Sequence, residues 1–180
     1  MTAVQRVELL TLEAWDLLGE DELWRSELQE GVYLRFPNPS LRHQSALMEL
    51  GVAQLYQQIP APLRLIPSVD VIVDGSFPPT VRRPDLIVVA DHPGDDAITV
   101  DHVVLIVEIL SPGTRRQDLV TKRSEYADAG IPHYWIVDLD GGPSVEALRL
   151  QDGAYVGDVV TGVLETAVPF DLRVDLTALA

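Results

Sequence analysis

Apolar residues gather in short unbroken runs along the middle of the chain, and this pattern predicts β-strands buried on both faces. A run of about four to eight apolar residues, rich in β-branched and aromatic side chains, is typical of such a strand. Four stretches meet this description: SVDVIVDG (68–75), PDLIVVAD (84–91), HVVLIVEIL (102–110) and HYWIVD (133–138). They predict the core of a β-sheet.

Two stretches before these strands have the end signals and spacing of helices. TLEAWDLL (11–18) begins with Thr11, a candidate N-cap, and predicts a short helix. A longer helix is predicted from Asn38 or Ser40 to about Gln58, because its leucines and alanines recur at approximately helical spacing.

A third helix is predicted between the last two of the four strands. Thr114, with Gln117 three residues later, has the form of a capping box. Gly130 and Pro132 then mark the end of the helix, as a C-terminal glycine and a following proline usually do.

The two ends of the chain add antiparallel elements to this order. ELQEGVYLRF (27–36) predicts two short strands that turn at 30–31, and turns at 141–142 and 152–153 divide the C-terminal part into small strands. We therefore predict an α/β fold in a single domain over residues 1–180. It comprises a mixed sheet flanked by helices, an N-terminal helix and hairpin, and a C-terminal antiparallel extension.

Composition narrows the class of protein. The chain has 180 residues, 47% of them hydrophobic, and no cysteine, which excludes disulfides, thiolate metal sites and a cysteine nucleophile. No apolar stretch approaches the roughly 18 residues of a membrane span, and the N-terminus lacks the order of a signal peptide. We expect a soluble, cytoplasmic protein with no membrane partner.

The net charge of −15 argues against tight non-specific binding to nucleic acid, because such binding depends on neutralising phosphates. Six of the 13 basic residues nevertheless form three adjacent pairs between positions 81 and 135. The pairs are Arg82–Arg83, Arg115–Arg116 and Lys122–Arg123. Two interpretations stay open: three solvated pairs on separate surfaces, or one surface that the fold assembles.

Glu108 interrupts an apolar strand near its end, and Asp85 begins the strand before it. If these strands return antiparallel to each other, the two carboxylates meet at one point of the sheet and raise each other's pKa. A divalent cation removes this repulsion, and oxygen ligands suit Mg²⁺ or Mn²⁺. The alternative is an aspartate satisfied by backbone donors and a glutamate paired with an arginine.

Lys122 is the only lysine in a chain with twelve arginines. A lysine ammonium is a compact point charge, which suits a role in orienting a nucleophilic water or stabilising developing phosphorane charge. Asp118 and Tyr126 lie four residues to either side, so all three side chains share one helical face. The alternative is an ordinary surface salt bridge between Asp118 and Lys122.

These residues resemble those of the PD-(D/E)XK nuclease superfamily, in a variant with a relocated lysine, and more closely those of the Uma-two family of restriction-endonuclease-like proteins. Position 110, where the superfamily's usual lysine would stand, is Leu110. The resemblance covers nearly the whole chain. It rests on ELQEG (27–31), His43, RPD (83–85), VEILSPGT (107–114), Asp118, Lys122, Tyr126, Gly130 and YWIVD (134–138).

The resemblance implies a restriction-endonuclease-like fold and a Mg²⁺-dependent phosphodiesterase site, with Mn²⁺ as a possible substitute. Asp85 and Glu108 would bind the metal, and Lys122 would be the catalytic lysine. We expect Arg115 and Arg116, at the start of the helix that carries Lys122, to contact the phosphate backbone. The residues expected to support the site or bind substrate are Glu27, Glu30, His43, Arg115, Arg116, Asp118 and Tyr126.

Two functions remain open. The first is a metal-dependent endonuclease that acts on nucleic acid, with DNA as the favoured substrate, and that forms a homodimer. The second is a catalytically silent module of the same fold that acts as a dimerising or regulatory partner. In the first case, we expect Lys122 to act on the nucleophilic water or on transition-state charge, so that its replacement would leave metal affinity and stability nearly unchanged.

Overall fold

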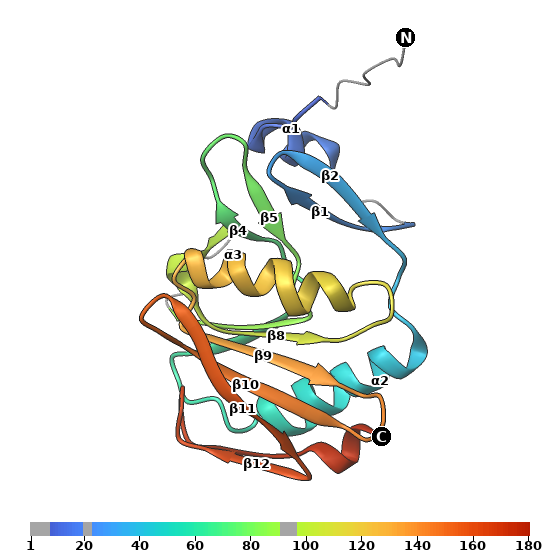
Figure 1. Ribbon diagram of the computed structural model, residues 1–180, viewed down its shortest axis with the longest axis vertical. Helices are drawn as coiled ribbons and strands as arrows, with labels where there is room; N and C mark the ends of the chain where they lie inside the picture. The colour runs from blue at the N-terminus through green and yellow to red at the C-terminus, as the bar shows by residue number, and fades with distance from the viewer. Residues whose placement is uncertain (1–7, 20–22, 91–96) are drawn as a thin grey trace.

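The chain folds into two main β-sheets, which stack one above the other in Figure 1, and a small third sheet. The structure is a computed structural model that describes residues 8–19, 23–90 and 97–180. The upper sheet has the order β2-β1-β5-β4-β7. Its strands are β1 (Arg25–Gln29), β2 (Val32–Phe36), β4 (Val71–Asp74), β5 (Thr80–Arg82) and β7 (Ile98–Thr99).

The lower sheet has the order β11-β10-β9-β8-β6-β3. Its strands are β3 (Arg64–Pro67), β6 (Leu86–Val89), β8 (Val103–Ile109), β9 (His133–Asp138), β10 (Ser144–Gln151) and β11 (Ala154–Thr161). The C-terminal hairpin of β12 (Val163–Thr166) and β13 (Leu172–Asp175) forms the third sheet. The predicted C-terminal antiparallel extension is therefore confirmed.

The helices lie on the faces and ends of these sheets. The principal ones are α1 (Leu12–Leu18), α2 (Leu41–Met48) with a π-helical continuation (Glu49–Leu55), and a π-helical turn (Gln117–Thr121) that leads into α3 (Lys122–Asp128). Short 3-10 helices cover Val100–His102 and Leu176–Leu179. Figure 1 shows α3 running just above β8, between the lower sheet and the strands of the upper sheet. No helix in the described part of the chain is long and apolar enough to cross a membrane.

Local signals place the first elements as expected. The Thr11 hydroxyl accepts a hydrogen bond from the backbone of α1, and the Ser40 hydroxyl accepts one from His43 N at the start of α2. Glu30 and Gly31 both have positive φ angles, of 46° and 75°. These two residues form the loop between paired Gln29 and Val32, and such values suit the tight turn of a two-residue hairpin.

The central strands bring the two predicted carboxylates together. β6 pairs antiparallel with β8, with Leu86 opposite Val107, so Asp85 just before β6 lies beside Glu108 near the end of β8. β8 then pairs in parallel with β9, and α3 lies in the connection between them. The antiparallel return predicted from the sequence is confirmed.

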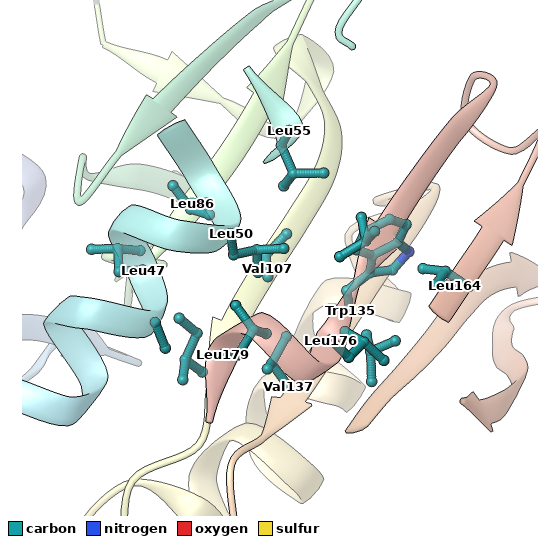
Figure 2. Packing of buried hydrophobic residues seen from close by; sticks show 14 of the residues in the cluster. Leu47, Leu50, Leu55, Leu86, Val107, Trp135, Val137, Leu164, Leu176 and Leu179 are labelled. Carbon is teal, nitrogen blue, oxygen red and sulfur yellow. The ribbon is translucent and has the colours of Figure 1, made fainter. Parts of the chain in front are cut away.

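The central strands β6, β8 and β9 of the lower sheet are buried on both faces, which explains their unbroken apolar runs. Leu86 of β6 packs in one core with α2 and its π-helical continuation, and Figure 2 shows Leu50 beside Val107 in this core. The next residue, Ile87, faces a second core that contains Tyr126 of α3. The core-facing residues of β8 and β9 likewise divide between the two cores. Glu108 extends from the face that α3 covers.

The structure also differs from the single mixed sheet that was expected, because its strands divide between two main sheets. The apolar run at 68–75 forms β4 of the upper sheet, whereas the run at 84–91 forms β6 of the lower one. Residue 91 lies outside the described residues. β3, β5 and β7 were not predicted, because strands of two to four residues are too short to show a periodic pattern.

The third predicted helix is present, but its first part is not a regular α-helix. Residues 117–121 form a π-helical turn before α3 begins at Lys122. The Thr114 hydroxyl lies 2.9 Å from the Ser111 hydroxyl, and no side chain caps the π-helical turn. A π-helical segment within a helix is rare and is frequently found at functional sites. Here it carries the buried Asp118.

Candidate active site

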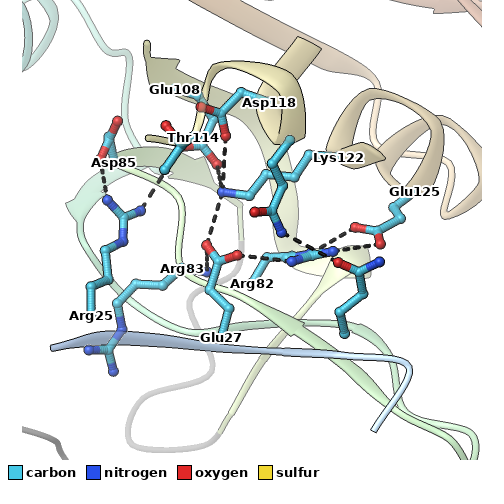
Figure 3. Close-up of polar contacts among 12 residues, drawn as sticks. Arg25, Glu27, Arg82, Arg83, Asp85, Glu108, Thr114, Asp118, Lys122 and Glu125 are labelled. Carbon is cyan, nitrogen blue, oxygen red and sulfur yellow. Dashed lines mark hydrogen bonds and ion pairs between the residues drawn. The ribbon is translucent and has the colours of Figure 1, made fainter. Parts of the chain in front are cut away.

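Five ionisable side chains from five segments meet between the two main sheets, and we call them the buried charge cluster (Figure 3). Each of these residues is at most 3% exposed. Unpaired charges are very rarely buried to this extent, because desolvation costs several kcal/mol, roughly, per ion. The members are Glu27 of β1, Asp85 before β6, Glu108 of β8, Asp118 of the π-helical turn and Lys122 of α3.

Lys122 lies at the centre of the cluster. Its Nζ is 2.7 Å from Glu108 Oε1, 2.9 Å from Glu27 Oε1 and 3.4 Å from Asp118 Oδ1. Burial alone disfavours its charge, but the three carboxylates together raise the pKa of Lys122 well above its usual value. Lys122 is therefore a permanent cation, which excludes it as a general base and suits it to stabilising negative charge.

Asp85 is fixed through both of its oxygens. Oδ2 accepts a hydrogen bond of 2.8 Å from Ile109 N, and Oδ1 accepts one of 2.7 Å from Arg25. His43 Nε2 lies 3.2 Å from the same Oδ1 without the alignment of a hydrogen bond. Although burial opposes ionisation of Asp85, the contacts with His43 and Arg25 lower its pKa to about 2. Asp85 is ionised at neutral pH.

The two carboxyl oxygens of Glu108 make different contacts. Oε1 accepts hydrogen bonds from Lys122 (2.7 Å) and from the Tyr126 hydroxyl (3.2 Å). Oε2 has one ion-pair contact, at 3.9 Å from Arg25 Nη2. Burial raises the pKa of Glu108 to about 8 despite the neighbouring Lys122, and the charges of Asp118 and Asp85 act in the same direction. In the metal-free protein this carboxyl therefore holds a proton at neutral pH.

A second group of residues supports Lys122 from the side of the upper sheet. The fully buried Arg82 donates to Glu27 Oε2 at 2.9 Å and to both oxygens of Glu125, at 2.6 and 2.8 Å. Burial tends to raise the pKa of Glu27, but Lys122 and Arg82 lower it overall. Glu27 is thus an ionised link between the two cations and restricts the position of Lys122.

Seven of the ten residues singled out in the sequence lie in or against the buried charge cluster. They are Glu27, His43, Asp85, Glu108, Asp118, Lys122 and Tyr126. Their catalytic and metal-binding roles remain predictions. The interpretation of Asp118 and Lys122 as a surface salt bridge is wrong, since the two side chains are only 2% and 3% exposed.

The other three residues lie outside the cluster. Glu30 is exposed in the β1–β2 turn and lines a different cavity of about 460 Å³. Arg115 is exposed and forms an ion pair of 2.7 Å with Asp138, and Arg116 is also exposed. The basic pairs of the sequence therefore separate: Arg82 and Lys122 are buried, whereas Arg115 and Arg116 face solvent.

Arg25 was not predicted from the sequence to be part of the site. Arg25 precedes Glu27 by two residues in β1, and alternate residues of a strand share a face. This spacing was a usable signal, because two charged residues on one face of a short strand indicate a polar partner. Arg82 was noted only as one of a basic pair, and nothing in the sequence distinguishes it from the partly exposed Arg83.

The net charge of the site matches that of one divalent cation. The buried charge cluster together with Arg25, Arg82 and Glu125 contains five carboxylates and three permanent cations, an excess of two negative charges when all are ionised. Carboxylate oxygens are the ligands that Mg²⁺ and Mn²⁺ prefer. Buried Asp118 Oδ1 also lacks a hydrogen-bond donor. The residues thus fit such a cation in charge and donor chemistry.

The side chains are not yet arranged as a metal site. Among the described residues, no three aspartate, glutamate or histidine side chains converge closely enough to hold a metal ion. The cavity lined by Asp85, Glu108 and Lys122 has a volume of about 30 Å³. That volume holds one or two water molecules, approximately. Some side chain must therefore move before a metal ion and a phosphate group can enter together.

The fold is that of a restriction-endonuclease-like protein. The chain resembles the crystal structure of a "putative nuclease belonging to DUF820" from Anabaena variabilis ATCC 29413, with a TM-score of 0.65. The two chains are 21% identical, and the likeness covers 94% of this chain and 97% of the other. At this level of identity the comparison shows the fold.

The sequence itself identifies the family. The profile of the Uma2 family, described as "Putative restriction endonuclease", matches residues 8–177. The chain belongs to the Uma2 family, and the resemblance noted in its motifs is confirmed. A comparison with curated proteins gave no match.

The raised pKa of Glu108 predicts how stability depends on pH in the presence of a chelator. Between the ordinary value of 4.5 and about 8, the folded chain retains a proton on Glu108 that the unfolded chain has lost. Stability therefore falls as the pH rises through this range. Urea unfolding at pH 6 and at pH 9 measures this change. From pH 6 to pH 9, the free energy of unfolding should fall more for the wild type than for Glu108→Gln, whose side chain cannot ionise.

Glu165→Gln serves as the control, because Glu165 is an exposed glutamate that forms its ion pair with Arg173. It should show the same pH dependence as the wild type. If the wild type and Glu108→Gln instead change in parallel from pH 6 to pH 9, Glu108 is ionised throughout and its pairing with Lys122 outweighs burial.

Proposed function

We propose that this protein is a divalent-cation-dependent nuclease that hydrolyses phosphodiester bonds in nucleic acid, with DNA as the favoured substrate. The observation that carries the proposal is the buried charge cluster, in which Asp85, Glu108 and Lys122 meet where β6 begins and β8 ends. Replacing such a cluster with apolar residues is often neutral or stabilising for a fold, so its presence favours a chemical role. Membership of the Uma2 family supports the same proposal.

Asp85 and Glu108 would hold a Mg²⁺ or Mn²⁺ ion. When bound, this ion supplies an activated water and stabilises charge on the leaving oxygen of the phosphodiester. Asp85 is ionised and fixed by Ile109 N, so it is a preformed ligand. Glu108 must release its proton to become the second ligand, and Tyr126 orients it by donating to Oε1.

Lys122 would stabilise the negative charge that develops on the phosphate or orient the attacking water. Both roles need a proton that stays on Nζ, and the surrounding carboxylates maintain it there. Glu27 and Asp118 hold the ammonium group from two sides and fix its position. His43 lines the same cavity, within reach of Asp85, where it is available to contact substrate or water.

Binding of nucleic acid must overcome the net charge of −15. We expect the affinity to depend strongly on salt, since only a few phosphate contacts can offset this repulsion. Arg116, exposed near the start of the helix that carries the site, is the candidate for such a contact. Arg115 can make one only by releasing Asp138.

A catalytically silent module remains the second candidate, and one observation favours it. The cluster carboxylates already have cations from the chain itself, as in a structural ion-pair network. Such a module would use its surface to dimerise or to regulate a partner. Homodimerisation is part of both proposals and is tested by measuring the molar mass in solution.

The metal site can be tested by titration calorimetry with Mn²⁺. The wild type should bind, whereas Asp85→Asn and Glu108→Gln should bind at least about tenfold more weakly, a loss of roughly 1.4 kcal/mol or more. Asp138→Asn is the matched control, because Asp138 is also a strand-end aspartate but is paired with Arg115 outside the cluster. If both site variants bind Mn²⁺ as tightly as the control does, these carboxylates are not its ligands.

Catalysis can be tested with Lys122→Met in Mn²⁺-dependent nicking of plasmid and cleavage of single-stranded DNA at low salt. Cleavage should fall about 10²-fold or more, the scale of a positioned catalytic group. The expectation that stability stays unchanged is revised, because Lys122 is buried among three carboxylates. Breaking such a buried pair costs about 3–5 kcal/mol.

Leu148→Ala controls for this loss of stability, since Leu148 is a buried core residue outside the site. Its replacement should cost about 2–5 kcal/mol and leave cleavage unchanged while the protein is folded. Circular dichroism sets a temperature at which both variants are folded. Equal cleavage by Lys122→Met and the wild type would remove Lys122 from the mechanism. A wild type that cleaves neither DNA nor RNA would favour the silent module.

A further inference from the structure

Arg25 is bound to the carboxylate pair that the proposed function assigns to the metal. Its Nη1 donates to Asp85 Oδ1 at 2.7 Å, and its Nη2 lies 3.9 Å from Glu108 Oε2 (Figure 3). One guanidinium therefore faces one oxygen of each carboxylate. A divalent cation that bound both oxygens would need the space between them that the guanidinium now occupies.

Of the three permanent cations in the network, Arg25 is held by the fewest contacts. Lys122 contacts three carboxylates, and Arg82 donates three hydrogen bonds to two of them. Arg25 makes one carboxylate hydrogen bond, and its buried Nη2 has no hydrogen-bond partner. A guanidinium with an unsatisfied donor loses less when it leaves than one that is fully bonded.

Arg25 is also the cation with a path to solvent. Its side chain is 15% exposed, whereas those of Lys122 and Arg82 are 3% and 0% exposed. It is the first residue of β1, so it lies at the end of that strand. Rotation of this one side chain toward solvent would open the cavity of about 30 Å³ that Arg25 lines, without moving the backbone of either sheet.

We propose that Arg25 is a displaceable counter-cation: in the metal-free protein its guanidinium pairs with Asp85 and faces Glu108, and it leaves both carboxyl groups when a divalent cation binds. This inference rests on the proposed function, because it takes Asp85 and Glu108 as the metal ligands. Because the guanidinium fills the space between the two oxygens that the metal would occupy, binding is an exchange. The binding free energy of the metal is reduced by the free energy of the Arg25 contacts that are lost. Arg25 therefore raises the metal concentration at which the site is half occupied.

The same contacts explain how the metal-free fold tolerates two adjacent buried carboxylates. Without Arg25, Asp85 would retain Ile109 N and His43 as partners, but no permanent cation would contact it. Removing Arg25 should therefore destabilise the metal-free protein and strengthen metal binding. These opposite effects distinguish a residue that competes with the metal from one that supports the metal site. Loss of a supporting residue would lower both the stability of the metal-free protein and its affinity for the metal.

The experiment compares Arg25→Met with Arg35→Met, measuring Mn²⁺ binding by calorimetry and the melting temperature with and without Mn²⁺. Arg35 is exposed on the neighbouring strand β2, paired with Ser26, so its variant has the same change in net charge without touching the carboxylates. Arg25→Met should bind Mn²⁺ about tenfold more tightly or better, a gain of about 1.4 kcal/mol. Its metal-free melting temperature should be lower than that of the wild type, and Mn²⁺ should raise it by more.

Each other result has a separate meaning. If the wild type binds Mn²⁺ and Arg25→Met binds with equal or lower affinity, the exchange is refuted while the proposed metal site stands. An equal gain in Arg35→Met would refute it too, because net charge alone would then explain the change. If no form of the protein binds Mn²⁺, the metal site of the proposed function fails and the exchange fails with it.

A measurement on the wild type covers the case in which Arg25→Met does not fold. In crystals grown or soaked with Mn²⁺, the anomalous signal should lie between Asp85 and Glu108, with Arg25 Nη1 moved beyond hydrogen-bond distance from Asp85 Oδ1. Metal bound at this position with the guanidinium still on Asp85 would overturn the proposal.

Discussion

The ion pairs of Lys122 with Glu27, Glu108 and Asp118 are the interaction on which the arrangement of this protein depends. Glu27 belongs to the upper sheet, Glu108 to the lower sheet, and Asp118 and Lys122 to the helical segment between them in space. One ammonium group thus connects three separate parts of the fold. Because buried ion pairs tolerate little error in geometry, this contact restricts how the two sheets and α3 can be placed.

The same network explains why stability and chemistry are linked in this protein. Four buried carboxylates and the partly exposed Glu125 share only three permanent cations, and burial raises the pKa of Glu108 to about 8, so that it retains a proton. A proton, the guanidinium of Arg25 and a divalent cation are therefore alternative ways to neutralise the same oxygens. The metal-free fold uses the first two, and the proposed nuclease would use the third.

Much of the site could be found in the sequence, because its residues stand at positions with a physical signal. Glu108 breaks an apolar strand, Asp85 begins the strand before it, and Lys122 is the single lysine of the chain. Arg82 could not be assigned in this way. It is one of twelve arginines, and only the pairing of β1 with β5 brings its guanidinium group to Glu27.

The sequence alone determined the order of the main helices and strands, the antiparallel return from Asp85 to Glu108, and the helical face shared by Asp118, Lys122 and Tyr126. These features follow from apolar periodicity and capping signals, which act over a few residues. The tertiary structure decided that the strands divide into two sheets and that Asp118 and Lys122 are buried, and it placed Arg25 on the carboxylates while Glu30 and Arg115 face away. Such features depend on contacts between residues far apart in the chain, which no local pattern encodes.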